Sequence, residues 1–179
     1  GRHLPHERVD RRRPIALRLR IDVRDDGHAR VVKRQRPQLG AEAVFVPATA
    51  ATGFLPDYAA LPAEVLERTA IAYMCSPANP QGAVASKDYL ADLLALAEKH
   101  DFRVLADECY SEIWRETPPP GLLQVAASQG ADPERALVFH SLSKRSNLPG
   151  LRSGFVAAGP ASMLRIRQLR AFAGAPLPL

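Results

Sequence analysis

The most constraining feature of this sequence is an alternation of short apolar runs with segments of helical period, which begins at residue 41. We predict strands at residues 43–48, 70–75, 103–106, 136–140 and 154–158. Helices are predicted at residues 62–68, 87–100, 122–129 and 161–172. Such an order is typical of an α/β fold, with a mostly parallel sheet covered by helices.

The helix at residues 87–100 has the clearest sequence signals. Ser86 precedes it and is a residue type favoured at helix N-caps. Its apolar side chains recur at helical spacing on one face, as Leu90, Leu93, Leu94 and Ala97. This face is therefore predicted to pack against the sheet.

Residues 1–40 differ in character from the rest of the chain. They carry 12 basic and five acidic residues, a net charge of +7, whereas residues 41–179 carry a net charge of −2. Only residues 15–21 alternate as a short strand would. A charge-rich segment buries too little apolar surface to offset its ordering entropy, so we predict an atypical or disordered basic arm ahead of a domain at residues 41–179.

Composition excludes several classes of protein. The sequence has neither a run of about 18 apolar residues, as a membrane span needs, nor the apolar core of a secretory signal. Its two cysteines, Cys75 and Cys109, are too far apart for a CxxC motif and lie in apolar runs. We predict buried, reduced thiols in a cytoplasmic protein, with no metal site and no nucleic-acid partner.

Polar residues follow three of the predicted strands. They are Asn79, Asp107, Tyr110, Ser141, Ser143 and Lys144, and Arg152 lies eight residues beyond the last of them. Taken singly, each has an ordinary structural explanation as a turn residue, a helix cap or a surface charge. Because ligands of α/β sheets bind beyond the carboxyl ends of the strands, we expect the set to form one site.

The set has one coherent chemical use. A lysine such as Lys144 can form a Schiff base when its amine is neutral, and a carboxylate such as Asp107 can hold a ring nitrogen protonated. Asn79 and Tyr110 can donate hydrogen bonds to a phenolate oxygen. The two serine hydroxyls and the guanidinium suit a phosphate group. These are the requirements of pyridoxal phosphate.

Three segments carry a resemblance to a known family: YMCSPANPQG, VLADECYSEIW and SLSKRSNLPGLRSGF. They resemble the class I and II aminotransferases, which are fold type I enzymes dependent on pyridoxal 5′-phosphate. The resemblance implies that Lys144 bonds the cofactor and moves a proton between the substrate Cα and the cofactor C4′. It also implies that Asp107 pairs with the pyridine nitrogen, and that Asn79 and Tyr110 bond the 3′-oxygen.

The same resemblance implies that Ser141, Ser143 and Arg152 bind the cofactor phosphate, and that the Asn79–Pro80 peptide bond can be cis. It implies a homodimer acting on an amino acid and a 2-oxo acid. Within the family, the motif spacing and the tail RAFAGAPLPL are similar to those of bacterial succinyldiaminopimelate transaminases.

The chain departs from the family in two respects. Complete members are about twice as long, so we expect a partial large domain at residues 41–179 and no small domain. The family's phosphate-binding turn and ring-stacking aromatic are not recognisable in residues 1–40. We therefore predict a transaminase in truncated form. The alternatives are a β-lyase of the same family, and an inert fragment that acts only through dimerisation or polyanion binding.

Overall fold

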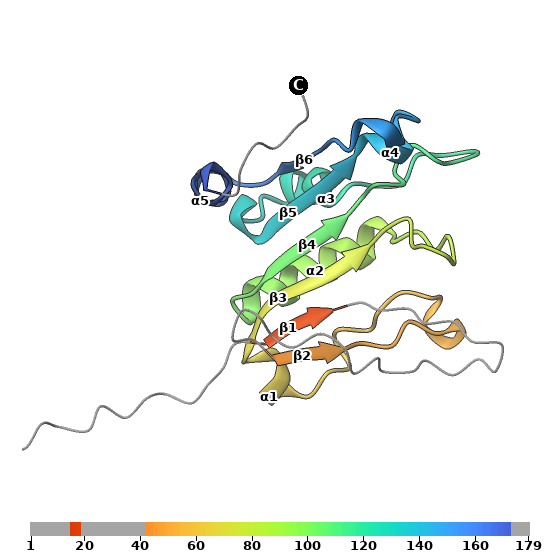
Figure 1. The fold of residues 1–179 in the computed structure, drawn as a ribbon. Helices are drawn as coiled ribbons and strands as arrows, with labels where there is room; N and C mark the ends of the chain where they lie inside the picture. The colour runs from red at the N-terminus through yellow and green to blue at the C-terminus, as the bar shows by residue number, and fades with distance from the viewer. Residues whose placement is uncertain (1–14, 19–41, 173–179) are drawn as a thin grey trace, which may run out of the picture.

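A computed structural model describes residues 15–18 and 42–172, and the prediction of a disordered arm lies largely outside them. Six strands form one sheet in the order β2-β1-β3-β4-β5-β6 (Figure 1). Their bounds are β1 Ile15–Arg18, β2 Glu42–Phe45, β3 Thr69–Cys75, β4 Arg103–Asp107, β5 Ala136–Ser141 and β6 Gly154–Ala157. The first five strands are parallel, and β6 runs antiparallel to β5.

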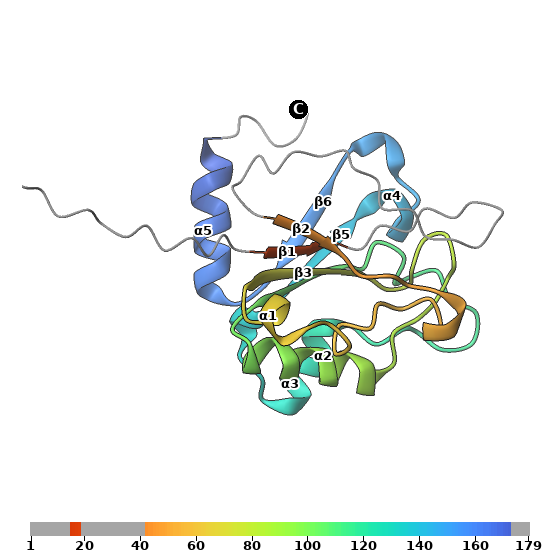
Figure 2. The ribbon, with the colours of Figure 1, turned by 90° about the horizontal axis from the view of Figure 1, so that it is seen from below.

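Helices α1, α2 and α3 lie together on one face of the sheet (Figure 2). The α-helices are α1 Ala63–Leu66, α2 Lys87–Lys99, α3 Leu122–Gln129, α4 Leu142–Arg145 and α5 Pro160–Ala171. Short 3-10 turns occur at η1 Ala50–Thr52, η2 Pro133–Arg135 and η3 Pro149–Leu151. Helix α5 lies on the other side of the sheet, near the ends where the strands begin (Figure 2).

The hydrophobic core lies between the sheet and α2 and α3. Along β3 and β4 every second side chain faces these helices, and Ala72, Met74, Val104 and Ala106 are all buried. Leu90, Leu93, Leu94 and Ala97 of α2 pack into the same cluster, as their spacing predicts. The Ser86 hydroxyl accepts a hydrogen bond from the Tyr89 backbone N–H at 3.1 Å, which confirms the predicted cap of α2.

The predicted α/β fold is therefore confirmed, with two additions. The segment at 15–18, expected as a short strand, is inserted in the sheet between β2 and β3. Residues 142–145, directly after β5, form the single-turn helix α4. Among the described residues, no helix combines the length and the apolar character that crossing a membrane requires.

Candidate cofactor site

The candidate site lies at the edge of the sheet where the parallel strands end. Cys75 and Asp107 are the last residues of β3 and β4 and are paired in register, and Asp107 is paired with Phe139 of β5. The loops that follow these strands carry most of the residues singled out in the sequence. Figure 1 shows these loops and α4 gathered at one end of the molecule.

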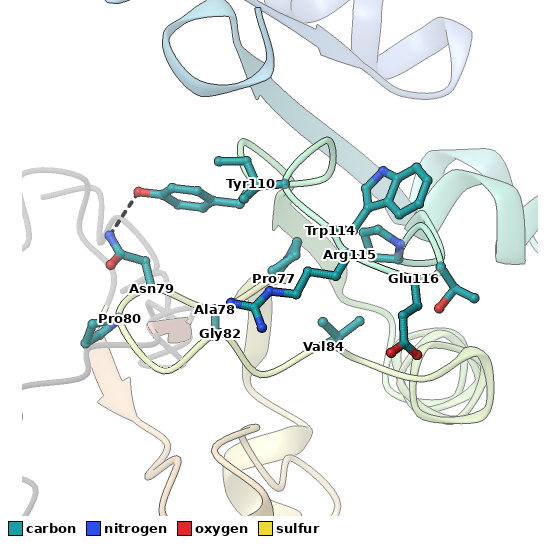
Figure 3. A pocket seen from close by; sticks show the side chains of 13 residues that line it. Pro77, Ala78, Asn79, Pro80, Gly82, Val84, Tyr110, Trp114, Arg115 and Glu116 are labelled. Atoms are coloured by element: carbon teal, nitrogen blue, oxygen red, sulfur yellow. Dashed lines mark hydrogen bonds between the residues drawn. The ribbon is translucent and has the colours of Figure 1, made fainter. Parts of the chain in front are cut away.

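Two of the predicted residues meet directly, although 31 positions separate them. The Asn79 amide Nδ2 donates a hydrogen bond to the Tyr110 hydroxyl at 3.0 Å (Figure 3). Asn79 is exposed and Tyr110 is half-buried, so both polar ends remain accessible. The Asn79–Pro80 bond is cis, as predicted, and so is the Ser76–Pro77 bond.

The loop that carries Asn79 is held by its own backbone. Ala78 N–H donates to the Ala83 carbonyl at 2.8 Å, and Gly82 N–H donates to the Ala78 carbonyl at 2.7 Å. The Ser76 hydroxyl accepts from Ala85 N–H at 3.0 Å in a buried setting. These bonds fix the position of Asn79 relative to β3.

A hollow of about 510 Å³ lies beside the Asn79–Tyr110 pair. Its walls include Trp114 and Arg115, neither of which the sequence analysis identified. Arg115 extends toward the loop at Ala78 and Gly82 (Figure 3). The nearness of this segment to Tyr110 in the sequence was the only available signal for it.

A second hollow, of about 610 Å³, opens on the face of the sheet opposite α2 and α3. Asp107 lines it, together with the residues Tyr73, Met74, Cys75, Leu105, Cys109 and Phe139. Asp107 is exposed, and its Oδ1 accepts a hydrogen bond from Cys109 N–H at 3.1 Å. A carboxylate thus stands in a largely apolar hollow, which suits pairing with a cationic ring nitrogen.

The prediction of buried thiols is wrong in part. Both cysteines are free, but each is only half-buried and lines the second hollow. Burial, together with the Asp107 carboxylate, raises the thiol pKa to about 11 for Cys75 and about 12 for Cys109. Both thiols are therefore protonated near neutral pH. Apolar neighbours in the sequence did not bury them because these side chains point away from the helices.

Glu108, the residue after Asp107, connects the end of β4 to the start of α3. Glu108 is buried, and its Oε1 accepts a hydrogen bond from Leu122 N–H, at the start of α3, at 2.7 Å. Its Oε2 lies 3.7 Å from His140 Nε2. Burial raises the pKa of Glu108, and burial followed by the charge of Arg145 lowers the pKa of His140.

Lys144 lies in α4, directly after β5, and is exposed. The Ser141 hydroxyl accepts from Ser143 N–H at 3.2 Å and so caps this single turn. Arg145 forms a 3.3 Å ion pair with Glu112, which ties α4 to the loop that follows Tyr110.

Arg152 lies between η3 and β6, near the point where β6 begins beside the end of β5. Leu142 N–H donates to the Ser153 carbonyl at 3.0 Å, and Ser141 is paired with Gly154. A Cβ at Gly154 would lie 2.5 Å from the His140 carbonyl oxygen, so this close return requires glycine. The Arg152 guanidinium donates to the Pro149 carbonyl at 2.9 Å and is exposed.

The structure thus places all seven predicted residues at one edge of the sheet. It joins Asn79 to Tyr110 by a direct hydrogen bond and brings the Arg152 segment against the Ser141 end of β5. Within residues 42–172, no hydrogen bond or ion pair joins the Lys144 amine to Asp107 or to the Asn79–Tyr110 pair. No group of three or more metal-ligating side chains gathers in the described part of the chain.

Comparison with known proteins decides the family. A model of the aminotransferases of class I and II matches residues 37–175. The chain belongs to this family. Members of the family depend on pyridoxal phosphate, and the predicted resemblance and fold type are confirmed.

Individual relatives agree with this assignment. An LL-diaminopimelate aminotransferase from Desulforudis audaxviator is 39% identical over 126 residues, which make up 70% of this chain and 31% of that protein. An aminotransferase from Neisseria meningitidis, known from a crystal structure, is 41% identical with a TM-score of 0.71. That match covers 75% of this chain and 34% of the Neisseria chain. A probable N-succinyldiaminopimelate aminotransferase from Thermus thermophilus is 28% identical, with a TM-score of 0.66. That match covers 74% of this chain and 34% of the Thermus chain. This chain therefore spans about a third of the length of the relatives it matches.

Proposed function

We propose that this chain is the cofactor-binding part of a pyridoxal-phosphate-dependent aminotransferase, which transfers an amino group from an amino acid to a 2-oxo acid. The observation that carries the proposal is the convergence of Asn79 and Tyr110 in a 3.0 Å hydrogen bond, beside the strand end that bears Asp107. Two donors and a carboxylate, carried by the ends of β3 and β4 and the loops that follow them, match the polar rim of a pyridoxal ring.

The donor set fits the cofactor chemically. The Asp107 carboxylate faces a hollow with largely apolar walls, where it would pair with the pyridine nitrogen. The Asn79 amide and the Tyr110 hydroxyl would bind the 3′-oxygen, because both can donate. Hydroxyls of Ser141 and Ser143 and the Arg152 guanidinium would bind the phosphate. When bound, the cofactor supplies an electron sink for the substrate Cα.

Lys144 would hold the cofactor and move the proton at the substrate Cα. Its helix turn is tied on two sides, by the Ser141 cap and by the ion pair between Arg145 and Glu112. The exposed Lys144 side chain can change rotamer while the backbone of α4 keeps its position. A fixed backbone with a mobile amine suits a group that must both bond the cofactor and transfer a proton.

We further propose a diaminopimelate-type substrate, in the succinylated form, and a role in lysine biosynthesis. The support is that an LL-diaminopimelate aminotransferase and a probable N-succinyldiaminopimelate aminotransferase are among the similar proteins. We propose a cytoplasmic homodimer as the working form. Measuring the half-reaction of the cofactor-loaded chain with free and with succinylated diaminopimelate would test the substrate, and only the succinylated form is expected to react.

The cofactor proposal can be tested by absorbance. Mixing the purified chain with pyridoxal phosphate should give a visible band of bound cofactor, and Lys144→Ala should abolish it. Lys99→Ala is a matched control, because Lys99 is exposed at the far end of α2, away from the strand ends.

Borohydride reduction followed by peptide mass analysis then locates the attachment. We expect the cofactor mass on the peptide that contains Lys144. Equal labelling of Lys99 or the N-terminal amine, or a band that survives in Lys144→Ala, would refute the proposal and favour an inert fragment.

A further inference from the structure

The single turn α4, which bears Lys144, is not held in place by burial. It lies where β5 ends and β6 begins (Figure 1), and none of its four residues is buried. A helix of one turn is not stable on its own, because fixing its backbone costs more than its few hydrogen bonds return. Contacts with neighbouring elements are therefore needed to keep α4 in one orientation.

Arg145, the last residue of this turn, has two partners. Its Nη2 lies 3.3 Å from Glu112 Oε1, and its guanidinium carbon lies 5.8 Å from the centre of the Phe155 ring. Arg145 and Glu112 are both exposed, and an exposed ion pair contributes little by itself. The ring adds a second attraction, because the face of an aromatic ring is negative and attracts a cation within about 6 Å of its centre.

Phe155 is itself held by His140. The two residues are paired in register across β5 and β6, and their rings are stacked with centres 4.8 Å apart and 29° between the planes. The Nε2 of His140 lies 3.7 Å from Oε2 of the buried Glu108. Burial, followed by the charge of Arg145, lowers the pKa of His140, so its ring is neutral near neutral pH. The side chains of His140, Phe155 and Arg145 thus form a ring stack with a single cation.

We propose that Phe155 is a positioning residue for Lys144: its ring holds the Arg145 guanidinium and so fixes the direction in which α4 presents the lysine amine. Neighbouring residues of an α-helix lie about 100° apart around its axis, so a turn fixed at Arg145 is also fixed at Lys144. The ring stack connects the end of β5 to the residue that would hold the cofactor. The consequence for the cofactor rests on the proposed function, whereas the connection between Phe155 and α4 does not.

The connection can be tested without any cofactor, by hydrogen–deuterium exchange of the peptide that spans residues 142–148. Ser146 N–H and Leu148 N–H both donate to the Leu142 carbonyl, so their exchange reports opening of the turn. Phe155→Leu keeps an apolar side chain but removes the ring, and should speed this exchange about two- to fivefold, as for loss of one exposed cation–π contact. Phe155→Tyr keeps the ring and should exchange at the parent's rate. Phe172→Leu is the matched control and should also leave the rate unchanged, because its ring is 90% exposed.

A double substitution tests whether Phe155 acts through Arg145. In an Arg145→Gln background the cation is already absent, so Phe155→Leu should have almost no further effect on the exchange of residues 142–148. The same acceleration by Phe155→Leu in both backgrounds would show that the ring acts by packing alone, and it would overturn the proposal. Exchange of Phe155→Tyr as fast as that of Phe155→Leu would overturn it as well.

The effect on the lysine is measured as the rate at which pyridoxal phosphate attaches to Lys144, followed by the visible band. Phe155→Leu should slow attachment at least about twofold, because the competent orientation of the turn is populated for a smaller fraction of the time. Phe155→Tyr should restore the parent's rate. Equal rates in Phe155→Leu and Phe172→Leu would contradict the proposed role. Absence of attachment in the parent and every variant would count against the proposed function alone, and the exchange rates would still decide the connection between Phe155 and α4.

Discussion

The two faces of the sheet differ in what their side chains contact. On the face covered by α2 and α3, Ala72, Val104 and Ala106 are completely buried. On the opposite face, Leu105 is half-buried and Phe139 is 37% exposed, and both line the hollow that contains Asp107. One face thus supplies most of the buried apolar area, and the other carries the hollow where we propose that the cofactor binds.

Two consecutive residues show the same contrast. Asp107 is exposed and directed toward the hollow, whereas Glu108 is buried and bonded to the first turn of α3. Glu108 directly follows β4, and its N–H still donates to the Phe139 carbonyl of β5, so the alternation of side chains between the two faces continues to it. One carboxylate therefore faces the hollow, and the next one is bonded on the covered face. Substitutions on the covered face should therefore change mainly the stability of the fold, and substitutions on the opposite face should change mainly cofactor binding.

The largest contrast is expected from two leucines. Leu94→Ala leaves a cavity between α2 and the sheet and should lower the free energy of unfolding by about 2–5 kcal/mol. Leu105→Ala, on the opposite face, should cost about 1 kcal/mol, because the side chain is only half-buried. Urea denaturation measures both values. Equal losses would show that both faces contribute alike to stability.

Two capping serines give a smaller contrast. Ser86→Ala removes the cap of α2 and should lower the free energy of unfolding by about 1 kcal/mol without changing the affinity for pyridoxal phosphate. Ser141→Ala removes the cap of the single turn that bears Lys144. It should weaken cofactor binding, and it should lower the melting temperature less than Ser86→Ala does. Thermal melts and cofactor titrations of both variants check this. A loss of affinity in Ser86→Ala would contradict the separation.

The smallest effect concerns pH. Burial raises the pKa of Glu108 in the folded chain, so between its ordinary value near 4.5 and the raised value the folded state holds more protons than the unfolded state. Stability contributed by this group is therefore lost as pH rises through that window. Glu108→Gln keeps an acceptor for Leu122 N–H but cannot ionise. Urea midpoints of the two proteins, compared from pH 4 upward, should show the parent losing stability relative to the variant. Parallel curves would contradict this direction.

The sequence predicted most of the fold because its local signals agree with one another. The apolar spacing of α2 identifies its buried side chains, and Gly121 and Gly130 flank the predicted helix at 122–129, whose bounds match α3. The position of β1 between β2 and β3 could not be predicted, because strand order depends on contacts between distant segments. The antiparallel direction of β6 could not be predicted for the same reason.

The candidate site was predictable where a residue type follows a strand end, as for Asn79, Asp107 and Lys144. The lining residues Trp114 and Arg115 were not, because they come from an irregular loop whose path only the tertiary structure defines. The cysteines were misjudged for a related reason. An apolar run indicates a strand, but only the placement of α2 and α3 decides which of its faces is buried.

Trp114 is the single tryptophan of the chain, and it lies 47% exposed on the wall of the hollow beside Asn79 and Tyr110. Its indole emission therefore arises from one known place. A molecule that contacts the indole in this hollow displaces water from the ring and changes its emission. The protein thus carries an intrinsic optical reporter, with which arrival and departure of a ligand can be timed in a stopped-flow fluorimeter without attaching a dye.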